Sequence, residues 1–170
     1  MPETKLPEPW LRGTLTEVSA VQRAVMHALV LAQEDLEVWC SGFTDAELNA
    51  RPAGLAPIAF HLRHIARSVD RLLTYAEGGQ LNSGQIAAMK TEMDPGATYQ
   101  DLFSELASAL THSAQQIRAI DPGTLGESRT VGRKQLPSTV GGLLVHVADH
   151  TQRHVGQAIT TAKVVGAHVK

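Results

Sequence analysis

Two histidines four residues apart, His150 and His154, are the clearest chemical feature of the sequence. They lie within a series of residues that recurs at the helical spacing of three and four, together with Leu143, Val147, Ala158, Thr161 and Val165. Side chains one helical turn apart point the same way, so two imidazole nitrogens can converge at about 2.0–2.1 Å from one divalent ion. The alternative is a pair of core histidines hydrogen-bonded to neighbours, and for an isolated pair that interpretation carries more weight.

The segment 57–76 supplies two more histidines, His61 and His64. The core of a helical bundle is where ligands from separate helices meet. One histidine from this segment and the pair from the last helix would give three protein ligands, which leaves coordination positions for water or substrate, as in catalytic sites. Projected around a helix, His61 lies closer than His64 to the middle of the apolar stripe, so geometry alone does not select His64.

The segments 60–66 (FHLRHIA) and 146–157 (HVADHTQRHVGQ) closely resemble the DinB/YfiT-like superfamily, a group of candidate metalloenzymes. The resemblance extends from the first predicted helix to Gly166. In that superfamily, one metal ligand is the histidine just before a small apolar pair on the second helix. A His-x-x-x-His pair on the last helix, followed closely by Gly-Gln, supplies the other two.

The resemblance therefore implies that His64, His150 and His154 bind a divalent metal ion. The N-terminal domains of mycothiol-dependent isomerases and of ergothioneine-pathway sulfoxide synthases share the pattern of the second helix. Some of them resemble a version that lacks the equivalent of His61, which favours His64 over His61 as the ligand. Many relatives have arginine where Val155 stands, a departure that affects the entrance of the site but removes no ligand.

The histidine pair does not form the zincin motif, which needs a glutamate directly after the first histidine, because Thr151 occupies that place. Gln157, one turn after His154, is a candidate to hydrogen-bond a ligand ring or a water on the metal. His146 is interpreted as a packing residue or a partner of the ligands. Cys40 is interpreted as a small buried hydrophobe, because no base is near it in the sequence. The histidines interpreted as structural or uninformative are His27, His112 and His168.

Four stretches of the sequence show helical periodicity, and the helices that they predict must position these histidines. They cover approximately residues 15–39, 57–76, 98–120 and 139–165, and Thr14 with Glu17 is a candidate capping box for the first. Short helices are predicted at 44–48 and 84–93, the second within a long crossover, and residues 123–137 are predicted to form a loop or small hairpin. The sequence thus predicts an all-α four-helix bundle with long connections, built from residues 1–170 as a single domain.

Composition narrows the range of partners. The 170 residues are 43% hydrophobic, enough for a bundle with its own core, and 15 basic residues nearly balance 17 acidic ones. The basic residues are scattered, which argues against nucleic acid as a partner. No apolar stretch approaches the roughly 20 residues that cross a bilayer. The single cysteine and the polar N-terminus predict a reduced, cytoplasmic protein.

The main functional hypothesis is a metal-dependent transferase or hydrolase acting on a small-molecule substrate. Imidazole ligands favour zinc, with nickel and iron(II) close behind. The thiol-dependent relatives imply a low-molecular-weight thiol as a second cofactor. The alternative hypothesis is a non-catalytic, stress-associated metal-binding bundle that acts through dimerisation, as a homodimer, or through another partner. A bundle without metal is the least attractive hypothesis, because several histidines in or beside the core would each need a partner.

Overall fold

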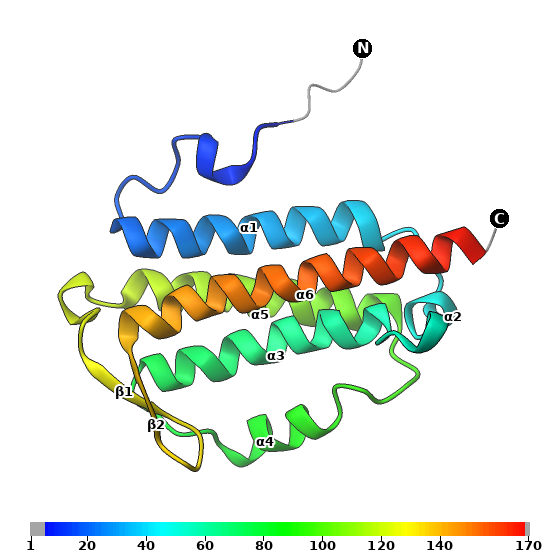
Figure 1. Cartoon of the computed structure of the whole chain (residues 1–170). Helices are drawn as coiled ribbons and strands as arrows, with labels where there is room; N and C mark the ends of the chain where they lie inside the picture. Colours follow the sequence, from blue (N-terminus) through cyan, green and yellow to red (C-terminus); the bar gives the residue numbers. More distant parts are fainter. Residues whose placement is uncertain (1–5, 169–170) are drawn as a thin grey trace.

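The computed structural model describes residues 6–168, which form a bundle of helices with one short hairpin (Figure 1). The helices, in chain order, are α1 (Ala20–Cys40), α2 (Asp45–Leu48), α3 (Ile58–Ala76), α4 (Ser83–Lys90), α5 (Tyr99–Ala119) and α6 (Val140–His168). Short 3-10 helices occur at Pro9–Leu11, Pro52–Gly54 and Pro122–Thr124. The strands β1 (Ser128–Val131) and β2 (Leu136–Thr139) pair antiparallel, with Ser128 opposite Thr139.

Four long helices, α1, α3, α5 and α6, lie alongside one another and confirm the predicted all-α four-helix bundle (Figure 1). Helix α6 packs against α1 and α3, and α3 also packs against α5. Helices α3 and α5 run in the same direction, because the segment with α4 returns along the outside of α3. The hairpin closes the end of the bundle where α5 stops and α6 begins.

The apolar stripe of each long helix forms the core, as the sequence period requires. On α3, Ile58, Leu62, Ile65 and Val69 are all 0% exposed, and burial of such a side chain stabilises the fold by about 1.5–3 kcal/mol. On α6, Val147 and Ala158 are fully buried in the same core. The two histidines of the α6 stripe are only partly buried, so they stand at the border of the core.

The start of the first helix differs from the prediction. Helix α1 begins at Ala20, where Ser19 and Gln22 form the capping box, and not at residue 15. Leu15 has a φ of 59°, a left-handed conformation that interrupts a right-handed helix. The hydroxyl of Thr14, predicted to cap the helix, instead lies 3.0 Å from Nε2 of His27.

The other helix boundaries are close to the predicted ones. Helix α3 begins at Ile58, with Pro57 in the capping position, and α6 continues to His168, three residues beyond the predicted end. The segment 123–137, predicted as a loop or small hairpin, contains β1 and the start of β2, which form a hairpin. None of the helices within residues 6–168 has a stretch long and apolar enough to cross a membrane.

Helix α4 is unusual because none of its residues is buried. Polar contacts attach it to α3: the side-chain amide of Gln85 donates to Asp70 Oδ2 at 2.7 Å and to Thr74 Oγ1 at 2.8 Å. The polypeptide that follows α4 crosses the outer face of α3, and it contributes a buried carboxylate to the histidine cluster.

Candidate metal centre

Three histidines from two neighbouring helices come together on the α3–α6 side of the bundle. One ligand atom each of His64, His150 and His154 lies within 4.8 Å of the other two. Nε2 of His64 and Nε2 of His150 are 2.8 Å apart, and the ring centroids of His64 and His154 are 4.3 Å apart. The i, i+4 spacing on α6 and the packing of α6 on α3 bring these three rings together.

The spacing of the rings is close to what a small divalent ion requires. Nitrogens at about 2.0–2.1 Å from a tetrahedral ion are about 3.3 Å apart, so a slight rotation of His64 and His150 from their 2.8 Å contact would accommodate one. The side chain of His64 is 18% exposed, and His150 and His154 are partly buried. All three rings are therefore partly exposed to solvent.

A buried glutamate, Glu92, fixes the orientation of His64. Its Oε2 lies 2.7 Å from Nδ1 of His64, its Oε1 accepts a hydrogen bond of 2.6 Å from Arg71, and the residue is 5% exposed. Burial raises the pKa of Glu92, but the hydrogen bonds from His64 and Arg71 and the charge of Arg71 outweigh it, so the pKa is lowered. An ionised carboxylate at Nδ1 can only accept a hydrogen bond, so the N–H of a neutral His64 ring lies at Nδ1 and the lone pair of Nε2 is directed at His150.

His61 belongs to the surroundings of the cluster and not to the group of three. It is 4% exposed, which agrees with its central place in the apolar stripe, and its Nδ1 lies 3.1 Å from Nδ1 of His154. When Nδ1 of His154 is the donor in this contact, Nε2 of that ring carries a lone pair. His61 thus occupies the position of a partner that orients a ligand ring.

Burial favours the neutral form of three imidazoles, those of His61, His150 and His154. Burial and, to a smaller extent, the nearby charge of His64 lower the pKa of His61 to about 4. Burial, followed by the charges of neighbouring histidines, also lowers the pKa values of His150 and His154 to about 4. Neutral imidazole is the form that binds a metal, so the environment favours ligation at physiological pH.

The secondary candidates are placed as follows. Gln157 is exposed and lines a cavity of about 480 Å³ beside His61, and within residues 6–168 it forms no hydrogen bond to a histidine. His146 is exposed, with its Nδ1 3.5 Å from the carboxylate of Asp149, and it is not among the three clustered rings. Cys40 is fully buried, and burial raises the pKa of its thiol to about 12, which agrees with a structural role.

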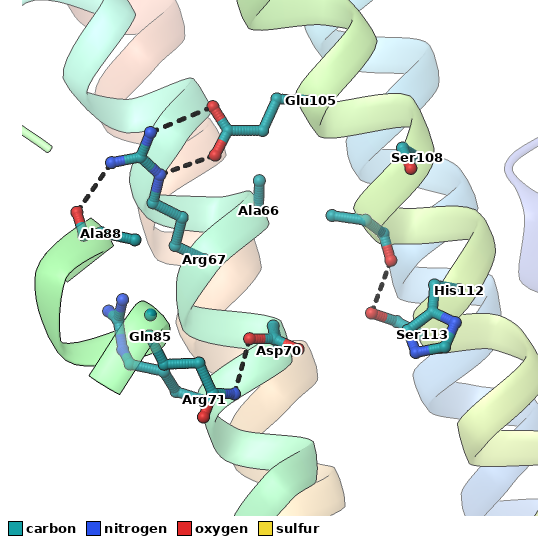
Figure 2. A pocket seen from close by; sticks show the side chains of 12 residues that line it. Ala66, Arg67, Asp70, Arg71, Gln85, Ala88, Glu105, Ser108, His112 and Ser113 are labelled. Carbon is teal, nitrogen blue, oxygen red and sulfur yellow. Dashed lines mark hydrogen bonds and ion pairs between the residues drawn. The ribbon is translucent and has the colours of Figure 1, made fainter. Parts of the chain in front are cut away.

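A second cavity, of about 430 Å³, lies between α3, α4 and α5 and includes none of the three clustered histidines (Figure 2). Arg67 and Asp70 line it from α3, and the exposed His112 lines it from α5. Two of its wall residues, Arg67 and Arg71, also contact the segment that carries Glu92. Sequence reasoning missed Glu92, because it lies in the turn after α4, where no period marks it.

Comparison with known proteins identifies the family. The family model of the DinB superfamily matches residues 28–158, which include all three clustered histidines. The chain belongs to the DinB superfamily. Its fold is similar to the crystal structure of a conserved protein from Enterococcus faecalis, with a TM-score of 0.73 at 21% identity, over 88% of this chain and 99% of that one. A comparison with curated proteins finds no significant match.

Membership of the DinB superfamily agrees with the resemblance of the two histidine segments. The matched region begins within α1 and ends within α6, so it contains the elements that position the cluster. The turn with Glu92 also lies inside it. The region that matches the family model therefore contains the three clustered histidines and most of the four long helices.

Proposed function

We propose that this DinB-like protein is a metal-dependent transferase or hydrolase in which His64, His150 and His154 hold one divalent ion. The observation that supports the proposal is the convergence of three imidazoles from two helices within 4.8 Å. An all-nitrogen set suits zinc first, with nickel and iron(II) next. Three protein ligands leave a coordination position for water or a small molecule, as catalytic sites do.

The residues of the cluster fit such an ion. The lowered pKa values of His150 and His154, about 4, keep both rings neutral near pH 7. Two rings have a nitrogen engaged by a buried partner: Nδ1 of His64 by Glu92 and Nδ1 of His154 by His61. The remaining nitrogens of those rings are the ones available for ligation, which is the arrangement expected of metal-binding histidines.

A divalent ion held here would supply a Lewis acid that lowers the pKa of a water or thiol ligand. Side chains of the protein would orient the ligand rings and accommodate the substrate. Glu92 retains the proton of His64 at Nδ1, and His61 keeps the ring of His154 in place. The cavity of about 480 Å³ beside His61, with Arg153 and Gln157 on its α6 wall, has room for a small-molecule substrate. The resemblance to thiol-dependent relatives supports a low-molecular-weight thiol as co-substrate.

The test begins with metal analysis of protein purified without a histidine tag. We expect close to one divalent ion per chain by mass spectrometry, and its loss in His64→Ala. The matched control is His112→Ala, which removes an exposed histidine of α5 that is outside the cluster. A wild-type chain that binds zinc, nickel and iron(II) no better than His64→Ala would contradict the metal site.

Activity is tested on the metal-loaded protein. Glutathione and cysteine, each with an aromatic chloride as electrophile, test thiol transfer through the loss of free thiol, and an activated ester tests hydrolysis. We expect turnover that His64→Ala loses and His112→Ala keeps. A metal-loaded protein that turns over none of these probes would favour the alternative, a non-catalytic metal-binding bundle that acts through dimerisation or another partner.

A further inference from the structure

Three arginines at four-residue intervals on α3 attach the end of α4 and the segment that follows it to the bundle. Arg63 donates to the carbonyl oxygen of Asp94 at 2.6 Å. One turn on, Arg67 donates to the carbonyl oxygen of Ala88 at 2.7 Å (Figure 2). The third, Arg71, donates to the carboxylate of Glu92, two residues after the end of α4. The three side chains lie on one face of α3 because residues four apart on a helix are neighbours.

The carboxylate of Glu92 bridges Arg71 and His64. The bond from Arg71 to Oε1 is 2.6 Å, and the contact of Oε2 with Nδ1 of His64 is 2.7 Å. A buried carboxylate is costly unless it is paired and hydrogen-bonded, so two donors on two oxygens account for its place in the structure. One of these donors is the ring that the metal centre needs in a fixed orientation.

We propose that Glu92 is a positioning residue of the metal centre, held in place by the arginine row and acting through His64. It keeps the ring proton of His64 on Nδ1 and thereby presents Nε2 to the ion. The inference rests on the metal-dependent function proposed above, and it adds a residue from a third segment of the chain to a site otherwise built from α3 and α6.

A purely structural role is the alternative, since an arginine–glutamate pair also joins elements of a fold. The chain offers a matched comparison in Glu105 of α5. Glu105 pairs with Arg67 at 2.6 Å, as Glu92 pairs with Arg71, but within residues 6–168 it forms no hydrogen bond to a histidine. If the α3 ion pairs only stabilise the bundle, removal of either carboxylate should have the same effect on metal binding.

The test compares the zinc affinities of Glu92→Gln and Glu105→Gln by competition with a chromophoric chelator. A glutamine at 92 offers one oxygen to two donors, so Arg71 or His64 must lose its acceptor. We expect Glu92→Gln to weaken zinc binding about 10–100-fold and Glu105→Gln to leave it within about twofold of wild type. Circular dichroism and thermal unfolding of both variants report whether the bundle is retained.

A second measurement needs no metal and reads the wild-type protein directly. Long-range proton–nitrogen correlation spectra of the metal-free wild type, with His64 assigned through His64→Ala, show which ring nitrogen carries the proton. We expect it on Nδ1. A proton on Nε2 of His64, or a Glu92→Gln variant that binds zinc as tightly as wild type, would overturn the positioning role while leaving the metal site intact. A wild type that binds no zinc would instead overturn the proposed function on which the inference rests.

Discussion

Acidification should destabilise the metal-free protein well above the pH at which its carboxylates are protonated. The cause is a set of histidines in and beside the cluster, of which His61, in contact with His154, is the most buried at 4% exposed. Burial lowers the pKa of His61 from 6.5 to about 4. In the unfolded chain the ring takes up a proton near pH 6.5, whereas in the folded chain it does so only near pH 4. Between these values the unfolded state binds more protons, so stability falls as the pH falls.

The magnitude follows from the two pKa values of His61, 6.5 unfolded and about 4 folded. A full proton difference changes the free energy of unfolding by about 1.4 kcal/mol per pH unit. Integrated from pH 7.5 to pH 5.0, His61 alone accounts for a loss of about 2 kcal/mol. In a domain of this size that corresponds to a Tm lower by roughly 4–8 °C. His150 and His154 act in the same direction, but both are partly exposed and contribute less.

The assay is urea unfolding followed by circular dichroism at pH 7.5, 6.5, 5.5 and 5.0, with a chelator present throughout. The informative variant is His61→Gln, which should lose about 2 kcal/mol less than wild type over this range. His112→Gln controls for the general effect of removing a histidine. The reasoning is refuted if the free energy of unfolding of His61→Gln depends on pH as steeply as that of wild type.

Three further outcomes are expected. In zinc titrations, His154→Ala and His64→Ala should lose tight binding, whereas His61→Ala should retain it with at most about a 10–100-fold weaker Kd, because His61 orients a ligand without being one. Protein treated with a chelator to remove metal should remain helical by circular dichroism. Zinc at a free concentration about one hundred times Kd should raise the free energy of unfolding by about 2.7 kcal/mol, which corresponds to a Tm increase on the order of 5–10 °C. Leu62→Ala, at a 0% exposed site, should cost about 2–5 kcal/mol in urea unfolding, against about 0.5 kcal/mol or less for Val38→Ala at a 75% exposed one.

The fold was largely predictable because the apolar period of each long helix is regular. The stripe from Ile58 to Val69 on α3 is buried as its spacing requires. The start of the first helix was not predictable, because the sequence contains two capping signals in succession, residues 14–17 (TLTE) and 19–22 (SAVQ). Only the second caps a helix in the structure, and the left-handed backbone at Leu15 excludes the first.

The site was predictable in part. The spacing of His150 and His154 alone indicates two rings on one face, but the choice of His64 needed the resemblance, because helical projection favours His61. The structure shows where the two candidate histidines lie relative to the pair on α6. The centre of an apolar stripe faces the middle of the core, where His61 is buried, whereas the cluster lies at the border between α3 and α6. Glu92 depends on tertiary contacts from α3, which leave no local pattern in the sequence.

The hydrogen bonds of the cluster indicate what metal binding must change. With Glu92 accepting from Nδ1 of His64, the 2.8 Å contact between Nε2 of His64 and Nε2 of His150 requires the proton of His150 to lie between them. If an ion were held by both Nε2 atoms, as proposed above, His150 would have to carry its proton on Nδ1. Nδ1 of His150 has no hydrogen-bond partner within the described residues, in contrast to the engaged Nδ1 atoms of His64 and His154. Under the proposed metal binding, His150 is therefore the ring whose tautomer would differ between the metal-free and metal-bound states, whereas Nδ1 of His64 and Nδ1 of His154 already have partners in Glu92 and His61.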